Sequence, residues 1–375
     1  SVLPALLPLF IYTYGLSLEQ AGFLILANTA LSSLLQPLLG YISDKLNQPR
    51  LITAGTLLSA CSTGMMGFVS SYESLLVCAT LAGVGSSIFH PEGAKIMNRL
   101  GGGKKGKAMG TFAIGGSSGF AFGPLFAGAI AYTVGAHGLA AFTVAGIIIS
   151  TVLFLLMPRI VAHAQTIDQA VATENPTVAA QPLKNYWKYF GILFIIILSQ
   201  SVNFRVINAF IPVFWTHELG TSPEQGSFAL TVFFSIGIFM TYIGGLLGDK
   251  YGPIKIIRLS LLIWLPSMFL LTQVPEFSVT IMMPLAYLIL LMIGAAKAIS
   301  YSPVIVLGQT YLAKSIGFAS GITLGVSQTI GGIIAPVVGN LADTYSLPAA
   351  MMTLVPFLVI GLGASLLLKD PKKLQ

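Results

Sequence analysis

The sequence predicts an all-α integral membrane protein with twelve transmembrane helices in two pseudo-symmetric six-helix bundles. Its 375 residues are 55% hydrophobic and only 8% charged, with a mean hydropathy of +0.86. A water-soluble domain needs more polar residues to cover its surface. Apolar runs of the ~18 to 20 residues that cross a bilayer recur along the chain. In addition, short motifs of the first half return in the second.

Polar residues divide the apolar sequence into twelve segments. Because the lipid interior offers the backbone no hydrogen-bond partner, we expect each segment to be a helix. In order, the predicted segments are 1–14, 19–42, 50–70, 74–97, 107–132, 137–157, 186–215, 224–247, 254–272, 277–302, 317–341 and 348–368. The first is short and opens on Ser1 rather than Met, so we expect the first helix to be truncated at its N-terminal side.

The composition changes between the sixth and seventh segments. Residues 158–185 are rich in Ala, Thr, Gln and Pro and contain no apolar stripe long enough to span a membrane. We therefore expect an N-terminal six-helix bundle over 1–157, a cytoplasmic linker over 158–185 and a C-terminal six-helix bundle over 186–375.

The distribution of charge predicts the orientation in the membrane. The chain has 19 Lys and Arg against 12 Asp and Glu, which gives a formal net charge of +7. All but two of the basic residues fall on one predicted face, whereas the loops on the opposite face have none. By the positive-inside rule, that face is cytoplasmic, with both termini inside a cell (inner) membrane. The basic balance is therefore a topology signal and predicts no nucleic-acid partner.

Three features of the first half recur in the second. The pairs are Gly40-Tyr-Ile-Ser-Asp44-Lys45 with Gly245-Leu-Leu-Gly-Asp249-Lys250, Pro91 with Pro303, and Pro124 with Pro336. The first pair is 205 residues apart and the other two are 212 residues apart. Three matches in order at nearly one offset indicate a duplication. Parallel six-helix repeats are typical of alternating-access transporters, whose substrate site lies between the halves near the midplane.

Several of these motifs resemble those of a known family. The two Gly-x-x-x-Asp-Lys loops resemble motif A of the major facilitator superfamily. A glycine-rich run in the fifth segment resembles the antiporter motif of that superfamily, with a departure at Ala127. Its residues are Gly110, Gly119, Gly123, Pro124 and Gly128. Within the superfamily, residues 35–41 and 83–92 resemble the fosmidomycin resistance protein group of drug exporters.

The resemblance implies the major facilitator fold over the whole chain and export rather than uptake. It implies that Asp44 meets the start of the eleventh segment near Gly317 and closes the cytoplasmic side, whereas the ordinary alternative is a solvated loop charge. The glycines of the fifth segment would let this helix rock against the other half, or only pack closely. Proton-linked exporters of the superfamily often have an Arg four residues before Gly83, where this chain has Ala79. Proton coupling here must therefore use another residue.

Three charged residues are predicted inside the membrane apart from motif A. They are Glu92 in the fourth segment, Arg205 in the seventh and Lys297 in the tenth. Each costs at least ~2.5 to 3.5 kcal/mol near a bilayer centre and should therefore face water or a partner. The resemblance implies that these three helices, with the first, line the central cavity.

Glu92 and His90 are the candidate proton-coupling residues. At 1.5 Å per residue, Glu92 lies ~28 Å along the helix from its external end, in the cytoplasmic half. Pro91 bends the helix and can aim both side chains at a wet cavity, where partial burial moves their titration toward neutral pH. Two alternatives compete: Glu92 neutralises Lys95 or Arg99 at the interface, or His90 only fills a packing position.

Arg205 and Lys297 are either ligands for an anionic substrate or structural partners for acids on the missing part of the first helix. With two cations against one titratable acid, the predicted cavity is net positive, which favours an anionic or phosphonate-like substrate. The residues expected to hydrogen-bond the substrate are Gln200, Asn203, Asn208, Tyr301 and Gln328.

We therefore predict a monomeric transporter in the lipid bilayer that exchanges a small anionic drug-like molecule for protons. The alternatives are an exporter of sugars or of neutral or amphipathic compounds, and a membrane receptor without transport. The sequence has no Ser-His-Asp arrangement, no His or Cys spacing for a metal and no phosphate-cradling loop. We accordingly expect no enzymatic activity, no cofactor and no bound metal.

Overall fold

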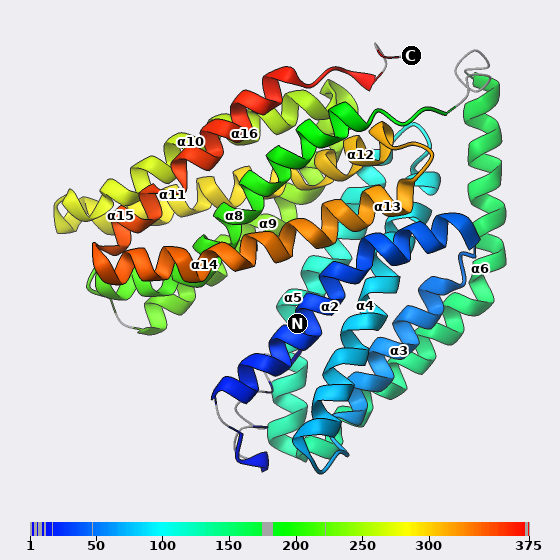
Figure 1. Cartoon of the computed structure of the whole chain (residues 1–375), viewed down its shortest axis with the longest axis horizontal. Coiled ribbons are helices and arrows are strands. Elements are labelled where there is room, and N and C mark those ends of the chain that lie inside the picture. Colours follow the sequence, from blue (N-terminus) through cyan, green and yellow to red (C-terminus); the bar gives the residue numbers. More distant parts are fainter. Residues whose placement is uncertain are drawn as a thin grey trace. The chain divides into compact units, whose positions relative to one another are not determined.

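The computed structural model describes residues 2–3, 6, 10, 13–16, 18–46, 48–174, 183–221, 223–371 and 374 (Figure 1). Over these residues the chain is helical apart from short connections, and the only strand-like pairing is a bridge between Asn185 and Leu312. Eight helical spans of this part are long and apolar enough to cross a membrane. The predicted all-α membrane class is therefore confirmed. The count of twelve helices stays a prediction, because much of the first segment lies outside the described residues.

The helices follow the predicted segments closely. In chain order they are α2 (Leu18–Leu46), α3 (Leu51–Met65), α4 (Tyr72–Gly101), α5 (Lys105–Val134), α6 (Ala140–Glu174), α8 (Trp187–His217), α9 (Pro223–Tyr251), α10 (Pro253–Gln273), α11 (Val279–Ile299), α12 (Tyr301–Tyr311), α13 (Ile316–Gly321), α14 (Ser327–Thr344), α15 (Leu347–Met352) and α16 (Val355–Leu367). A π-helical turn over Ile322–Val326 joins α13 to α14. The tenth, eleventh and twelfth predicted segments are thus each interrupted by a local change in helical geometry.

Helix ends follow from the local sequence. The Ser71 side chain accepts a hydrogen bond from the backbone N–H of Ser74 and so caps the start of α4. Gly252 has a φ of 92°, in the left-handed region that favours glycine, and makes the turn between α9 and α10. Pro253 then occupies the first turn of α10, where its missing N–H costs no helical hydrogen bond.

The chain forms two compact units. Unit 1 comprises Ser1–Gly102, Gly115–Leu183 and Ser315–Val326, and unit 2 comprises Gly103–Ile114, Lys184–Lys314 and Ser327–Gln375. Each unit takes most of its residues from one half of the sequence and a short segment from the other half. The start of α5 belongs to unit 2, whereas α13 and the π-helical turn belong to unit 1. The domain boundaries expected after residues 157 and 185 stay a prediction.

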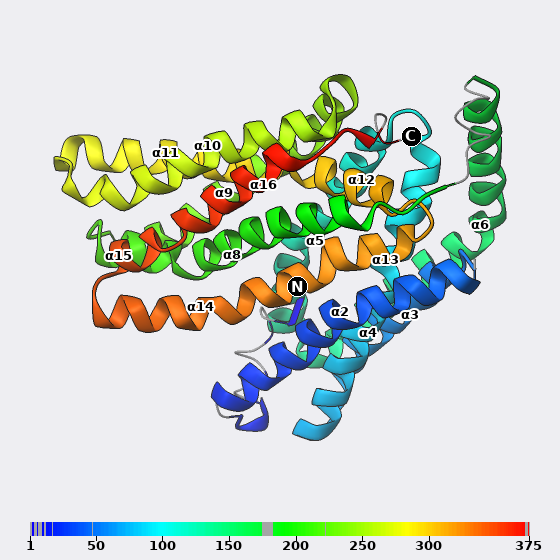
Figure 2. The same ribbon diagram turned by 45° about the horizontal axis from the view of Figure 1, so that its top comes forward.

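In unit 1, α4 packs against α2 and α3, and α3 packs against α6 (Figure 2). Small residues allow the close approach of α3 and α4, because a Cβ at Gly55 would lie only 2.7 Å from the carbonyl oxygen of Gly85. Leu75 and Ala79 of α4 are fully buried. In place of the arginine that proton-linked exporters often carry, Ala79 thus occupies a tightly packed position.

In unit 2, α8 packs against α9, α14 and α16, and α11 packs against α9 and α10. Trp215 and Trp264 are fully buried in this unit. By contrast, large apolar side chains face outward in both units: Ile148 is 58% exposed, Leu155 67% and Leu366 65%. Such surfaces suit a lipid environment rather than water.

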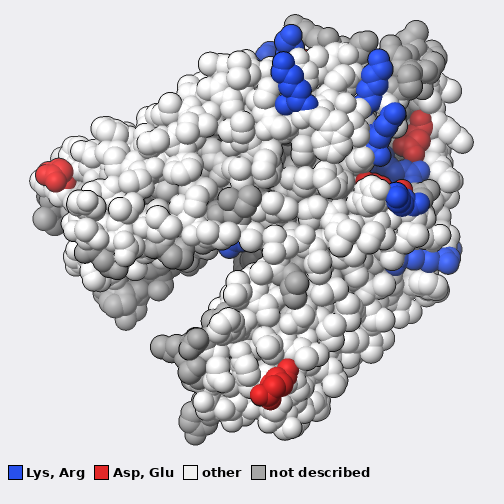
Figure 3. All heavy atoms as spheres, in the orientation of Figure 1, with Lys and Arg blue, Asp and Glu red and all other residues white. Residues whose placement is uncertain are grey.

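On the face that Figure 3 shows, Lys and Arg side chains gather toward one end of each unit, beside a largely uncharged surface. In unit 1 this basic end includes Lys45, Arg50 and Arg99, which lie where α2 ends, α3 begins and α4 ends. In unit 2 it includes Lys250 and Lys255, which flank the connection from α9 to α10. The charge asymmetry expected from the sequence is therefore present within each unit.

Helix α6 continues well beyond the predicted sixth segment. It passes through Pro158 and ends at Glu174, so the first part of the predicted linker is helical. Arg99 of α4 donates hydrogen bonds of 2.9 and 3.1 Å to Asp168, which holds this extension against α4. Ile167 also packs over Gly102 at the end of α4. Residues 175–182 lie outside the described residues.

Candidate functional site

Arg205 and Lys297 lie together in unit 2, on α8 and α11. The ammonium nitrogen of Lys297 lies 4.3 Å from the ring centroid of Phe204 and 5.3 Å from that of Tyr301. Both distances fit cation–π interactions, which gain strength away from water. The Nε of Arg205 is buried and has no hydrogen-bond partner among the described residues.

No acidic side chain neutralises this pair within the described part of the chain. The two ion pairs there are Lys95 with Asp44 and Arg99 with Asp168, both in unit 1. In residues 186–375 every Asp and Glu lies at or beyond a helix end. Two half-buried cations without an acid are costly unless an anion binds between or beside them. The arrangement is therefore suited to binding an anion.

The predicted hydrogen-bonding residues divide into two groups. Gln200 lies near Lys297, because its Oε1 accepts a 3.4 Å hydrogen bond from Ser300 at the end of α11, and its Nε2 is buried without a partner. Tyr301 joins the same group through its ring. Asn203 is fully buried and donates to the carbonyl oxygens of Ser199 and Leu354 at 3.0 and 3.3 Å, so its amide ties α8 to the start of α16.

For two further residues that were predicted to bind the substrate, the structure gives no contact with the group around Lys297. Asn208 is half-buried, and no hydrogen bond of its side chain joins it to the pair of cations in the described structure. Gln328 lies on α14, but its side chain is outside the described residues.

Aromatic residues that sequence reasoning did not select complete the surroundings of Lys297. Phe204 stacks on Phe233 of α9 at a centroid distance of 6.1 Å and meets Phe234 edge-on at 6.2 Å. The adjacent Phe233 and Phe234 in a helix otherwise rich in aliphatic and small residues were the available signal. These rings form an apolar wall beside the two cations.

Glu92 lies in unit 1 and is only 1% exposed. Its Oε2 accepts a short hydrogen bond from the hydroxyl of Ser43 on α2, while its Oε1 is buried and has no partner in the described part of the chain. The ammonium of Lys95 lies 3.5 Å from Asp44 and donates to the Ser43 carbonyl at 3.1 Å. Glu92 therefore belongs to a cluster with Ser43, Asp44 and Lys95, which we call the α2–α4 charge cluster.

His90 lies on the same helix but makes different contacts. Its Nδ1 lies 2.8 Å from the carbonyl oxygen of Ser86 and 3.2 Å from the Ser86 hydroxyl, one turn earlier in α4. The structure gives His90 and Glu92 no hydrogen bond to each other. The ion pairs considered for Glu92 also differ from those observed, because Lys95 pairs with Asp44 and Arg99 with Asp168. Helix α4 continues through Pro91 without a break.

The two motif A acids each hold the start of another helix. Asp44 accepts hydrogen bonds of 3.1 Å from the backbone N–H of Gly317 and 3.2 Å from that of Phe318, within unit 1. Asp249 accepts hydrogen bonds of 2.7 and 2.8 Å from the N–H groups of Gly106 and Lys107, within unit 2. Exposed amides at a helix start favour a negative charge. Each acid therefore fastens a segment that comes from the other half of the sequence.

The other motif A residues have packing roles. Gly40 lies against the backbone of Gly317, and Gly245 lies against that of Gly106, so a Cβ at either position would meet a carbonyl oxygen. The basic residues contact neighbouring aromatic rings instead of the acids. The ammonium nitrogen of Lys45 lies 4.7 Å from the ring centroid of Tyr41, and that of Lys250 lies 5.1 Å from the ring centroid of Tyr251.

The glycines of the predicted antiporter motif do not share one environment. Gly110 packs on α9, because a Cβ there would lie 3.1 Å from the Cα of Tyr242. Gly119 has open space where a Cβ would lie, and Gly123 is half-buried. The contacts of Pro124 and Gly128 fall outside the described residues.

Comparisons with known proteins agree with this architecture. The family model of the Major Facilitator Superfamily matches residues 1–336 and 193–375. An uncharacterized MFS-type transporter of Bacillus subtilis (strain 168), YfnC, is 28% identical over 375 residues, which cover 99% of this chain and 90% of the relative. The fosmidomycin resistance protein of Escherichia coli (strain K12) is 29% identical over 354 residues, which cover 92% of this chain and 83% of that protein.

Solved structures share the fold at low sequence identity. The Escherichia coli fucose:proton symporter superposes with a TM-score of 0.71 at 15% identity, covering 98% of this chain and 95% of the symporter. The human organic anion transporter MFSD10 superposes with a TM-score of 0.73 at 15% identity, covering 96% of this chain and 88% of that protein.

Proposed function

The chain belongs to the major facilitator superfamily and is a transporter, and from that membership we propose that it exports a small anionic, phosphonate-like solute in exchange for protons. The relatives' names support export of drugs: beside the fosmidomycin resistance protein, multidrug resistance proteins 1 and 2 of Bacillus subtilis are each 21% identical to this chain.

The observation that carries the proposal is the pair Arg205 and Lys297 without an acid. A guanidinium presents a fixed fork of N–H donors, and an ammonium is a compact point charge. Together they suit a group with several anionic oxygens, such as a phosphonate or carboxylate, because charge-assisted hydrogen bonds are about twice as strong as neutral ones. Gln200 supplies a nearby donor whose Nε2 has no other described partner.

The proton is assigned to Glu92, with His90 as the second candidate. In the α2–α4 charge cluster, Lys95 already neutralises Asp44, so an ionised Glu92 would add a second, uncompensated carboxylate to a buried site. A neutral Glu92 is compatible with the observed contacts. When Glu92 releases its proton, it attracts Lys95 and competes with Asp44 for that cation.

This competition links the proton to a structural change. Asp44 holds the start of α13, and its charge is balanced by Lys95. Redistribution of Lys95 toward Glu92 alters that balance and therefore the stability of the contact between α2 and α13. In an alternating-access cycle, the hydrogen bonds that Asp44 and Asp249 accept form when the transporter closes at its basic end. They break when that end opens.

Transport measurements in proteoliposomes test the anion site. We expect Arg205→Gln and Lys297→Gln to lower transport of fosmidomycin at least about 10-fold, because a buried hydrogen bond to a charged group contributes about 1.5 to 3 kcal/mol. Lys255→Gln is the matched control, since it removes an exposed cation at the basic end of unit 2. Unchanged transport in both substitutions at the pair would refute the anion site.

A second candidate, export of neutral or amphipathic compounds, is favoured by the aromatic surroundings of Lys297. The rings of Phe204 and Tyr301 already contact its ammonium, which fits a structural role for the cation. In the same assay, a neutral sugar or amphipathic dye that is transported equally well by the parent protein and by Arg205→Gln would support this alternative.

A further inference from the structure

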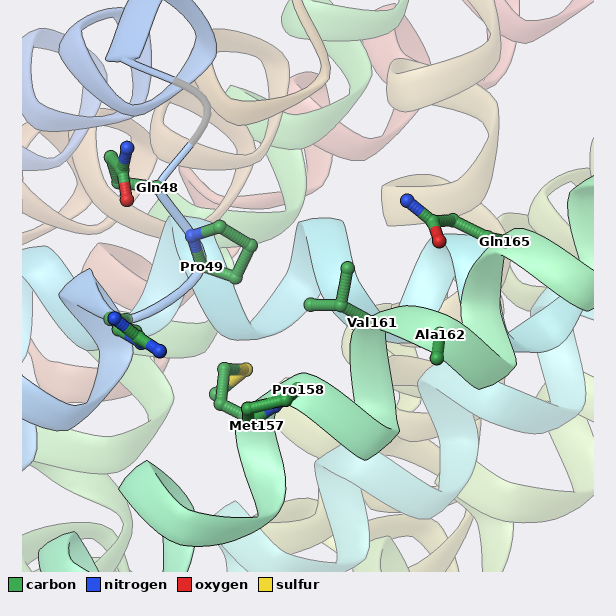
Figure 4. Close-up of a pocket in the computed structure, with 8 residues that line it drawn as sticks. Gln48, Pro49, Met157, Pro158, Val161, Ala162 and Gln165 are labelled. Atoms are coloured by element: carbon green, nitrogen blue, oxygen red, sulfur yellow. The ribbon is translucent and has the colours of Figure 1, made fainter.

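A groove separate from the candidate transport site lies in unit 1, beside the connection from α2 to α3. It has a volume of about 220 Å³. The connection contributes Gln48, Pro49 and Arg50. Helix α6 contributes Met157, Pro158, Val161, Ala162 and Gln165. Figure 4 shows Gln48 and Pro49 on the left and the α6 residues across from them, with Met157 and Pro158 below and Gln165 at the upper right.

The groove has a cation that no described acid neutralises. Arg50 is exposed, and its guanidinium carbon lies 5.0 Å from the ring centroid of Phe154 on α6. Neither of the two ion pairs in the described part of the chain involves Arg50. A guanidinium held over a ring keeps its N–H groups free at its edge, where they can bind the oxygens of a phosphate.

The remaining polar groups fit a phosphate ester with a hydrogen-bond donor. Gln48 and Gln165 bring side-chain amides to opposite sides of the groove. Met157 and Val161 make the floor apolar.

The position of the groove along α6 favours a lipid as the source of the phosphate. Before it, α6 exposes large apolar side chains, with Ile148 58% exposed and Leu155 67% exposed. Arg159 and His163, which lie among the groove's α6 residues, are both exposed, and the polar extension of the helix follows. This change from apolar to polar surface marks the level of the lipid headgroups.

We infer that this groove binds the headgroup phosphate of a membrane phospholipid, with Arg50 as the phosphate ligand and the acyl chains lying along the apolar face of α6. Gln48 and Gln165 hydrogen-bond the headgroup. The site is independent of the pair Arg205 and Lys297, which belongs to unit 2.

Binding of phosphatidylglycerol to the purified full chain in detergent tests the inference, with native mass spectrometry and thermal unfolding as readouts. We expect Arg50→Gln to weaken binding at least about 10-fold and to abolish the rise in unfolding temperature on adding lipid. Gln165→Leu should weaken binding less. Lys255→Gln, which removes an exposed cation elsewhere, should bind as the parent does.

Two further measurements make the outcome decisive. Equal unfolding temperatures of the parent, Arg50→Gln and Gln165→Leu without lipid show that the variants are folded. If Arg50→Gln does not fold, the lipid binding of Gln165→Leu alone tests the site. In a second measurement, inorganic phosphate is added in place of the lipid and the unfolding temperature is compared. Equal protection by phosphate would overturn the lipid assignment, and lipid binding unaffected by Arg50→Gln and Gln165→Leu would overturn the site.

Discussion

Lys95 lies in one cluster with two carboxyl groups, those of Asp44 and Glu92, which have different surroundings. Asp44 receives backbone hydrogen bonds as well as the ammonium, whereas Glu92 has one hydroxyl donor and one oxygen without any described partner. A buried carboxyl with so few donors is better accommodated neutral than charged. The two acids are therefore suited to different tasks, one as a fixed charge and the other as a proton carrier.

Replacing Glu92 tests this division of tasks. We expect Glu92→Gln to keep substrate exchange across a vesicle membrane but to lose its acceleration by an imposed pH gradient, because an amide preserves the hydrogen bond from Ser43 and cannot take up a proton. Both rates are measured in proteoliposomes. Glu73→Gln, at the exposed start of the same helix, should respond to the gradient as the parent does. A pH response that survives in Glu92→Gln would rule out its proton role.

At the scale of single residues, the sequence predicts which charged residues are unusual but not which side chains they contact. Arg205, Lys297 and Glu92 are identified because charges are rare inside apolar segments. Their neighbours Phe204 and Ser43 depend on how each helix is rotated about its axis. Weakly amphipathic membrane helices give little information on that rotation, since lipid and protein surroundings are both apolar.

The contact between α2 and α13 depends on glycine. Gly40 and Gly317 bring the two backbones together, which places the N–H of Gly317 within 3.1 Å of Asp44. A side chain at either position would separate the helices and lengthen these hydrogen bonds. The hydrogen bonds of motif A and the close packing are thus two parts of one structural element.

Gly40→Ala measures the importance of that element. We expect it to destabilise the protein by about 1 to 3 kcal/mol, because its Cβ would overlap the carbonyl oxygen of Gly317 in a packed site. Thermal unfolding in detergent detects this as a lower midpoint. Gly191→Ala on α8 is the control, since a Cβ there meets nothing within 4 Å and alanine is the better helix former. A midpoint for Gly40→Ala at or above that of the parent would contradict the packing argument.

At the scale of helices, apolar segments are predictable and their continuations are not. Residues 158–174 lack an apolar stripe, yet α6 continues through them because Asp168 binds Arg99 and Ile167 packs on Gly102. Such tertiary contacts override weak local preference. The sequence does not predict the π-helical turn between α13 and α14 either.

Over the whole molecule, the internal repeat predicts two similar bundles, and the structure has two units of corresponding composition. It does not predict that 103–114 and 315–326 group with the opposite unit. Those segments are fastened there by Asp249 and Asp44, whose partners are backbone N–H groups that any sequence provides. The motif A resemblance predicts the contact of Asp44 with the segment start near Gly317, whereas no partner is predicted for Asp249.

The orientation in the membrane can be tested with the two ends of α10. We expect a cysteine at Lys255 to react with a membrane-impermeant maleimide only after the cells are permeabilised, because the positive-inside rule predicts that the basic end faces the cytoplasm. A cysteine at Glu276, beyond the other end of α10, should react in intact cells. Both are introduced after Cys61 and Cys78 are replaced by Ser. The opposite labelling pattern would invert the predicted topology.

That no described acid lies beside Arg205 and Lys297 has an electrical consequence. With no described acid to neutralise this pair, an unloaded unit 2 would carry positive charge within the membrane. Displacing one elementary charge through the whole field changes the energy by about 2.3 kcal/mol per 100 mV. A bound dianion would cancel that charge. The empty carrier would then sense the membrane voltage during its return, while the occupied carrier would move almost independently of it.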